Sequence, residues 1–299
     1  MIYNDLPYNI LVSYAFAGKD EALCEMLFNA SQAGKINVMI DSGAFSKHNA
    51  KKIDLSHINV RDYCSLLHRY GDKCEKYVML DKVGDAAQSR KNYEMMLADG
   101  LNPMWVATMF DNDFDYMAAA VERNRDICVA GGATTKGPWM MQRFQRVYKN
   151  TGEVARIHGL AYVTIPDMFR APIASVDSSS WSVQASKYGW LYSWDERIHN
   201  TQKVHWRDAW RTQKIPVLIQ KDMEGMGITK RDFFIRKNHT TEQSIEVILS
   251  IKRMILMQRY AKRHGRDLFA AVMTRGNLRN YLWCLEHFNE LDYHEFAKL

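Results

Sequence analysis

Short apolar segments recur along the first 180 residues of this chain, and the intervals between them are long enough to hold helices. Each segment is a near-continuous run of apolar residues, which is typical of strands in a parallel sheet covered on both faces. The segments are NILVSYAF (9–16), INVMIDSG (36–43), KYVMLD (76–81), MWVATMF (104–110), DICVAGG (126–132), IHGLAYVT (157–164) and PIASVDSS (172–179). They predict a sheet with at least seven parallel strands.

The intervals between the segments have the pattern of amphipathic helices, as in residues 20–34 and 85–100. The second of these stretches ends at Gly100, a residue that commonly terminates helices. Repeated strand–helix alternation predicts an α/β protein with a (β/α)8 TIM-like barrel, and a doubly wound open sheet is the alternative. The eighth strand is expected in YGWLYSW (188–194) or IPVLIQ (215–220).

The sequence predicts a single domain. We expect residues 1–299 to form a single barrel domain, because no stretch of the chain has the composition of a linker. Residues 240–299 contain two long helical patterns, so they are expected to be additional C-terminal helices packed on the barrel.

Composition narrows the class of protein. The chain is 47% hydrophobic, which is enough for a large core and excludes a disordered protein. The five cysteines are scattered and form no CxxC pair, so they are expected to be free thiols in a reducing compartment. With no leader pattern and no membrane-length apolar run, a cytoplasmic protein is expected. The net charge of +6 favours an anionic partner, nucleic acid ahead of a membrane surface.

Three of the predicted strands end in an acid, namely Asp41, Asp81 and Asp177. In a barrel the carboxyl ends of the strands form the active-site face, so these carboxylates should converge. For any one of them the alternative is a turn or helix cap. The histidines show no spacing typical of metal ligands, and we expect no metal site.

Two other features accompany these acids. The fifth segment ends in Gly131 and Gly132, where the lack of side chains would let a flat ligand approach the backbone, although a tight turn explains them equally well. Phe45 follows Asp41 closely and could stack on a planar base, or it could belong to the core.

These residues lie in motifs that resemble a known family. DSGAFS (41–46) resembles the DSGGFQ-type motif of the tRNA-guanine transglycosylases. HGLAYVTIPDMFRAPIASVDSSSW (158–181) is similar to the family's His-Leu-hydrophobic-Gly stretch, which leads to the strand with the catalytic aspartate. VAGGA (129–133) and VMLD (78–81) lie where the family has a Gly-Gly turn and a base-recognising aspartate. The order and spacing agree over roughly residues 36–181.

The resemblance implies a TIM-barrel glycosyltransferase (a pentosyltransferase) that exchanges guanine for a free 7-deazaguanine base without breaking the nucleic-acid backbone. Asp177 would be the nucleophile, Asp41 the general acid/base, and Asp81 the acceptor of hydrogen bonds from the base. Further residues would surround the base with backbone groups, a stacking ring or polar side chains: Gly131, Gly132, Phe45, Ser42 and His158. For His158, a hydrogen-bonded structural role is the alternative.

The chain also departs from the family pattern. Ala44 and Ser46 replace the usual Gly and Gln, and the C-terminal CxCxxC zinc motif is absent because Cys284 stands alone. We therefore expect no zinc and no other cofactor. A compact chain of this kind resembles the phage-type DNA-guanine transglycosylases (DpdA type), which implies DNA as the substrate and, for a phage protein, the host cytoplasm. The alternatives are the same chemistry on tRNA, or a non-catalytic barrel that binds nucleic acid as a partner subunit.

Basic residues near these motifs are expected to contact nucleic acid, namely Lys136, Arg170 and Lys187. In residues 181–211, five tryptophans alternate with five basic side chains, a pattern that suits stacking on unpaired bases. Packing in a core is the alternative, because Trp206 and Trp210 are one helical turn apart.

Overall fold

The computed structural model of the 299-residue chain describes residues 7–44, 58–107, 114–130, 137–162, 165–197, 200–235 and 244–299. Contacts within the chain divide it into two compact units. The barrel unit comprises Met1–Ser178 and Gly265–Met273, and the helical unit comprises Ser179–His264 and Thr274–Leu299. The expectation that residues 1–299 act as one domain stays a prediction.

The barrel unit is built on a parallel sheet of eight strands in the order β3-β2-β1-β10-β7-β6-β5-β4. Its strands are β1 (Tyr8–Ser13), β2 (Ile36–Asp41), β3 (Lys76–Tyr77), β4 (Trp105–Ala107), β5 (Asp126–Val129), β6 (Arg156–Gly159), β7 (Ile173–Ser178) and β10 (Asp267–Val272). A parallel bridge between Val78 and Met104 joins the two outer strands, with Met79 N–H donating to Met104 O at 3.0 Å. The curled sheet therefore closes on itself, and the predicted α/β TIM-like fold is confirmed.

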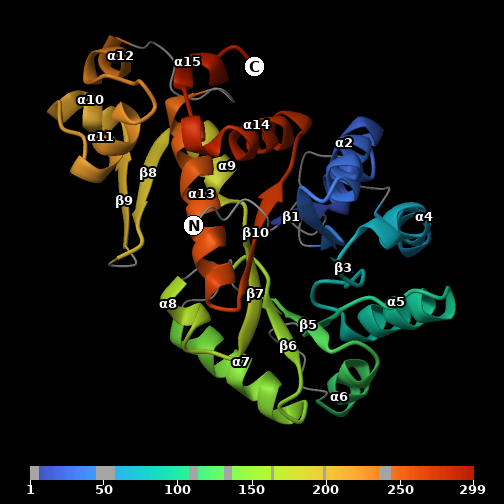
Figure 1. The fold of residues 1–299 in the computed structure, drawn as a ribbon. Helices are drawn as coiled ribbons and strands as arrows, with labels where there is room; N and C mark the ends of the chain where they lie inside the picture. The colour runs from blue at the N-terminus through green and yellow to red at the C-terminus, as the bar shows by residue number, and fades with distance from the viewer. Residues whose placement is uncertain are drawn as a thin grey trace. The chain divides into compact units, whose positions relative to one another are not determined.

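Helices lie between these strands, on the outer side of the curled sheet in Figure 1. They are α1 (Tyr14–Ala17), α2 (Glu21–Gln32), α4 (Val60–Tyr70), η1 (Gly71–Lys73), α5 (Ala86–Ala98), α6 (Phe114–Arg123), α7 (Gly137–Asn150) and α8 (Ile165–Met168). Side chains cap the first turns of several: Asp20 accepts from Leu23 N–H and Asp85 from Gln88 N–H, at 3.0 and 2.9 Å. Gly100, with φ of 80°, follows the end of α5 as the sequence predicts.

The eighth strand is where the sequence prediction is wrong. Residues 188–194 fall largely in a strand of an antiparallel hairpin, and residues 215–220 lead into a helix. The eighth strand of the sheet is β10, which lies inside the segment expected to be only helical. The strand–helix alternation is interrupted because residues 179–264 are inserted between β7 and β10. Its sequence, DLFAAV (267–272), is a short apolar run like those of the other strands, and its pairing with both β1 and β7 identifies it as the eighth strand.

The helical unit contains the hairpin of β8 (Trp190–Asp195) and β9 (Asn200–His205). Its helices are α9 (Ser180–Ser186), α10 (Trp206–Thr212), α11 (Val217–Glu224), α12 (Lys230–Ile235), α13 (Ile245–Arg263), α14 (Arg275–Glu286), η2 (Phe288–Glu290) and α15 (Tyr293–Phe296). The long helix α13 buries Ile248, Ile251 and Ile255 and packs against α9 and β8. It thereby forms the centre of this unit's core.

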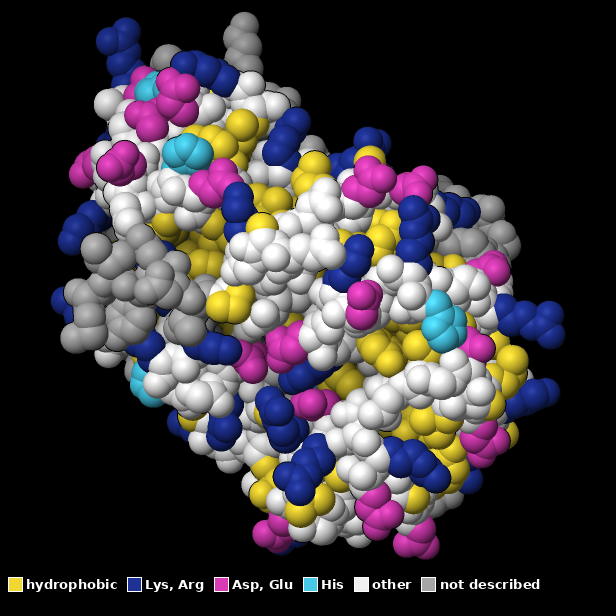
Figure 2. All heavy atoms as spheres, turned by 45° about the vertical axis from the view of Figure 1, so that its right-hand side comes forward, with side chains coloured by type: hydrophobic (Ala, Val, Ile, Leu, Met, Phe, Trp, Pro, Cys, Tyr) yellow, Lys and Arg dark blue, Asp and Glu magenta, His cyan; other side chains and the backbone are white. Residues whose placement is uncertain are grey.

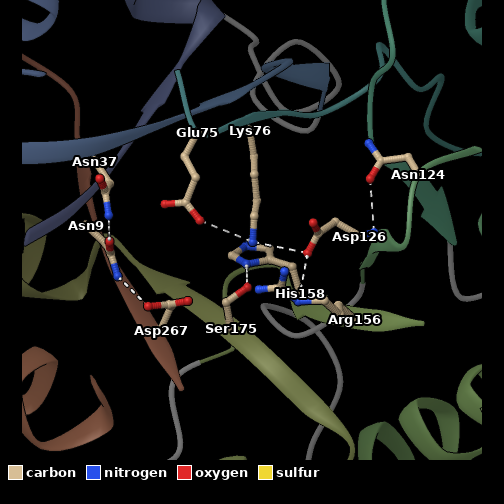
Figure 3. A network of polar contacts seen from close by, with 10 residues as sticks. All are labelled: Asn9, Asn37, Glu75, Lys76, Asn124, Asp126, Arg156, His158, Ser175 and Asp267. Carbon is tan, nitrogen blue, oxygen red and sulfur yellow. Dashed lines mark hydrogen bonds and ion pairs between the residues drawn. The ribbon is translucent and has the colours of Figure 1, made fainter. Parts of the chain in front are cut away.

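The amino ends of the strands, which we call the barrel floor, hold a network of polar side chains (Figure 3). Asn37 donates to Asn9 Oδ1, and Asn9 donates to Asp267 Oδ1, each at 3.1 Å. In a second group, the buried Lys76 ammonium lies 3.1 Å from Asp126 Oδ1. Glu75 and Arg156 flank this second pair, at 3.5 Å from Lys76 and 3.7 Å from Asp126. The charge of Lys76 is therefore balanced by nearby carboxylates, although its ammonium group makes no hydrogen bond with ideal geometry.

Two surface properties bear on possible partners. Among the described residues, no helix combines the length and apolar character needed to cross a bilayer. On the face shown in Figure 2, Lys and Arg side chains are interspersed with Asp and Glu side chains, and no single basic patch covers it. On this face the net charge of +6 is therefore not gathered into one basic surface.

Candidate active site

The three strand-end acids meet at the carboxyl ends of the strands, which we call the barrel rim. Asp41 is the last residue of β2, Asp177 the penultimate residue of β7, and Asp81 lies in the loop after β3. The charge of Asp177 raises the pKa of Asp41, and the charge of Asp41 raises the pKa of Asp81. The three carboxyl groups are thus close enough to repel one another, as the barrel geometry predicts.

Asp177 is held by one of its two oxygens. Its Oδ1 accepts a hydrogen bond from the Ala161 N–H at 2.7 Å and lies 3.3 Å from His158 Nε2. Ala161 has a φ of 53°, a left-handed conformation that costs energy for a residue with a Cβ. Within the described part of the chain, Oδ2 accepts no hydrogen bond. The two contacts at Oδ1 therefore fix the orientation of the carboxylate and leave Oδ2 without a hydrogen-bond donor among the described residues.

His158 connects Asp177 to the interior of the barrel. Its side chain has no exposed surface, and its Nδ1 lies 2.8 Å from Ser175 Oγ. Phe269 packs against the imidazole edge to face, with ring centroids 5.8 Å apart. Ser175 and Asp177 project to the same side of β7 because they are two residues apart. These contacts make His158 a hydrogen-bonded support for Asp177, and its ring has no free surface that could meet a ligand.

Asp41 is a buried carboxyl group with a strongly shifted titration. Burial and the charge of Asp177 raise its pKa to about 6. Hydrogen bonds from the Gly43 N–H (3.0 Å to Oδ2) and the Ser13 hydroxyl, together with the nearby His158, limit that rise in pKa. A carboxyl group that titrates near neutrality can both donate and accept a proton under physiological conditions.

The residue after Asp41 and Ser42 has to be glycine. Gly43 has a φ of 78°, and a Cβ built on it would lie 2.8 Å from both the Cβ and the backbone nitrogen of Ala15. Glycine lets the chain turn back sharply enough for its own N–H to reach the Asp41 carboxylate. The DSG sequence therefore forms a tight turn in which the Gly43 N–H holds the Asp41 carboxylate at the strand end.

The pKa of Asp81 is raised further than that of Asp41. Burial and the charge of Asp41 raise the pKa of Asp81 to about 7, and the Ser42 hydroxyl, 3.4 Å from Oδ1, opposes that rise. Its loop is fixed by Asn92, whose side-chain amide donates to Leu80 O at 2.9 Å. Near neutral pH the Asp81 carboxyl group is therefore partly protonated, so it can donate as well as accept a hydrogen bond.

The other residues predicted for the site lie in different places, and some lie outside the described residues. Arg170 is exposed after α8, and Lys187 is exposed at the end of α9 in the helical unit. The remaining predicted residues lie outside the described residues, namely Phe45, Gly131, Gly132 and Lys136. Ser42 and His158 contact the acids, so they are part of the same cluster.

Sequence reasoning missed three contributors to this site, namely Ser13, Ala161 and Ser175. Ser13 is a polar residue at the end of the first apolar segment, so the rule that identified the acids could have found it. Ala161 contributes a backbone N–H, which has no signal in the sequence. Among the described ranges, no group of three or more His, Cys, Asp or Glu side chains is arranged to hold a metal ion.

No protein-family model and no curated protein matches this sequence. The chain is therefore assigned to no family, and its function has to be argued from the geometry of the rim.

Proposed function

We propose that this protein exchanges guanine in DNA for a free 7-deazaguanine base, by double displacement through Asp177. The observation that carries the proposal is the rim cluster: a carboxylate held by one oxygen, beside a second carboxyl group with a pKa of about 6. N-glycosidic cleavage needs a group to stabilise and then bond to the sugar, and a proton donor for the departing base. Asp177 and Asp41 fit those two roles.

In the first step, Asp177 Oδ2 bonds to C1′ of the nucleotide as the bond from C1′ to guanine N9 breaks. The electron pair of that bond goes to guanine, and the protonated Asp41 supplies a proton, so that guanine leaves neutral. With a pKa of about 6, a useful fraction of Asp41 carries this proton near neutral pH. The phosphate backbone stays intact because the sugar is held as an ester of Asp177.

In the second step, the incoming base attacks C1′ through its ring nitrogen and gives the N–H proton to the ionised Asp41. The ester bond breaks, its electron pair returns to Asp177, and both carboxyl groups recover their starting states. Asp81 would hold the base by its N–H edge, because its carboxyl group both donates and accepts near neutrality. The target nucleotide has to leave its stack to reach this site.

DNA is favoured over tRNA because the chain lacks the zinc motif that the tRNA-acting proteins it resembles carry. Labelled 7-deazaguanine should therefore enter guanine-containing DNA and not tRNA. Incorporation into tRNA alone would support base exchange but show that the substrate is tRNA and not DNA.

The test of the mechanism uses the wild-type protein, Asp177→Asn and, as a matched control, Asp115→Asn at an exposed acid on α6. Wild type and the control should incorporate label and form a covalent protein–DNA adduct at Asp177, detectable by mass spectrometry. The Asp177 variant should do neither. Incorporation at an undiminished rate by that variant would exclude the mechanism, and no incorporation by the wild type into either nucleic acid would exclude the function.

A further inference from the structure

In the helical unit, the hairpin β8–β9 leads directly into α10 (Figure 1). Aromatic and cationic side chains of the hairpin and of the start of α10 contact one another. We define the aromatic–cation surface by Trp190, Lys203, His205, Trp206 and Arg207. Trp190 and His205 are partners in the register of the hairpin, and their rings meet edge to face with centroids 5.4 Å apart. The His205 and Trp206 rings are nearly parallel, at an interplanar angle of 25°.

Each indole of this surface has a cation above it. Lys203 Nζ lies 5.3 Å from the centroid of Trp190, and the Arg207 guanidinium carbon lies 5.4 Å from that of Trp206. Both cations are exposed, and within the described residues neither forms an ion pair with a carboxylate. Their charge is therefore not neutralised, and it is held beside flat apolar rings.

Backbone features fix the rings in place. Trp206 lies against Gly189, whose φ is 67°, and a Cβ at Gly189 would come within 2.1 Å of the indole. The Arg207 N–H donates to His205 Nδ1 at 3.2 Å, which orients the imidazole at the start of α10. The rings are thus set before any ligand arrives, which lowers the entropic cost of binding.

Further aromatic surface is exposed beside this group. Tyr188, just before β8, is 58% exposed, and Trp210, one turn beyond Trp206 on α10, is 50% exposed. Lys187 adds an exposed cation next to Tyr188. Trp181 and Trp194 are buried, so they pack in the core as the alternative interpretation of this segment predicts. Tyr188 and Trp210 are exposed and do not.

We propose that the aromatic–cation surface binds a single-stranded polynucleotide. The partly exposed rings of this surface, with the exposed Tyr188 and Trp210, can stack on unpaired bases of any sequence, and cations without carboxylate partners can follow the phosphate backbone. A duplex would offer the phosphates but not the base faces. The binding requires no base exchange, so it can be tested apart from the proposed function.

The probe is a fluorescein-labelled 15-nucleotide oligothymidylate, which contains no guanine and so cannot be a substrate for guanine exchange. Fluorescence anisotropy with the full-length protein, between 50 and 200 mM salt, gives the affinity and its salt dependence. Lys203→Met and Arg207→Met keep the apolar stem and remove the charge. Each should weaken binding and reduce the slope of log K against log salt by about 0.7.

Trp190→Ala should weaken binding about tenfold by removing a stacking face. Lys149→Met, at an exposed lysine on α7 in the barrel unit, is the matched control and should change the affinity less than twofold. Melting temperatures confirm that each variant is folded. Equal losses for Lys149→Met and Lys203→Met, tighter binding of the duplex, or no binding of the oligothymidylate at 50 mM salt would each overturn the proposal.

A labelled oligouridylate of the same length forms a second arm, and either polymer bound through these residues supports the surface. Oligothymidylate binding by a protein that exchanges no base would retain this surface and remove the proposed function. Base exchange by a protein that does not bind the oligonucleotide would do the reverse.

Discussion

The floor and the rim of the barrel both contain acids that are partly or fully buried, but the acids have opposite surroundings. At the floor, Asp126 lies beside Lys76 and Arg156, and Asp267 accepts a hydrogen bond from Asn9. At the rim, among the described residues, no Lys or Arg forms an ion pair with any of the three acids (Asp41, Asp81 and Asp177). Carboxyl groups with matched partners stabilise a fold, whereas acids that repel one another cost stability. The difference supports the proposal that the rim carries the chemistry, whereas the floor stabilises the fold.

The largest expected effect comes from replacing Asp177, the proposed nucleophile. Asp177→Asn should lower base exchange by about 10⁴-fold or more, because no other group can form the covalent intermediate. The pKa of Asp41 should fall in this variant, since the charge of Asp177 helps to raise it. Single-turnover rates and NMR titration of Asp41 measure the two effects. A variant within tenfold of wild type would show that the rim acids do not act as proposed.

The second prediction concerns the stability that Asp81 costs. Its pKa is raised from 3.8 to about 7 in the folded protein, so between about pH 4 and pH 7 the unfolded chain ionises at this group first. Stability is therefore lost as the pH rises through that range, and the loss is complete above the folded pKa. A difference of about three units corresponds to roughly 4 kcal/mol.

Asp81→Asn removes this titration while keeping the shape of the side chain. The variant should gain about 4 kcal/mol over wild type in free energy of unfolding at pH 8, and almost nothing at pH 3. Its base exchange should fall, because the amide cannot change its protonation state to match the base. Urea unfolding at both pH values measures the gain. An equal change in stability at pH 3 and pH 8 would mean that Asp81 titrates normally.

The third prediction tests the floor in the same way. Lys76→Met should lower the free energy of unfolding by about 2 kcal/mol, since it leaves the partly buried Asp126 carboxylate with only the more distant Arg156 as a cation. Adding Asp126→Asn should restore much of that loss, because the double variant has no unpaired buried charge. The exchange rate of the folded protein should stay within a few-fold of wild type. Loss of exchange without loss of stability would reverse the roles of floor and rim.

The sequence predicts the rim better than the floor, for a physical reason. Asp41, Asp81 and Asp177 could be found because strand ends are visible as apolar runs, and all parallel strands end on one side. Gly43 could be anticipated as a turn residue. The pair of Lys76 and Asp126 depends on barrel closure and register, which bring together residues far apart in the chain.

Two further features could not be predicted from the sequence: a hydrogen bond from a backbone N–H, and the place of a strand that follows a long insertion. The Ala161 N–H that holds the Asp177 carboxylate belongs to a residue with no polar side chain, in a conformation that only the folded loop imposes. The strand β10 is hidden between two helical stretches, and its role is set by pairing with β1 and β7. The apolar run of β10 is a local signal, but its place in the sheet and the contact of the Ala161 N–H are not local, so periodicity cannot predict them.

The smallest effects are expected where the rim is joined to the barrel interior by His158. His158→Gln should lower exchange about 10²-fold by letting the Asp177 carboxylate move from its position. Ser175→Ala, which leaves the imidazole in place but removes its partner at Nδ1, should cost only a few-fold. A positioning role predicts that the rate falls with little change in KM. It also predicts that the alkaline limb of the pH–rate profile moves to higher pH, because His158 lowers the pKa of Asp41, the proton donor of the first step. If instead both variants lose stability while the folded protein keeps its rate and pH profile, His158 belongs with the stabilising groups of the floor.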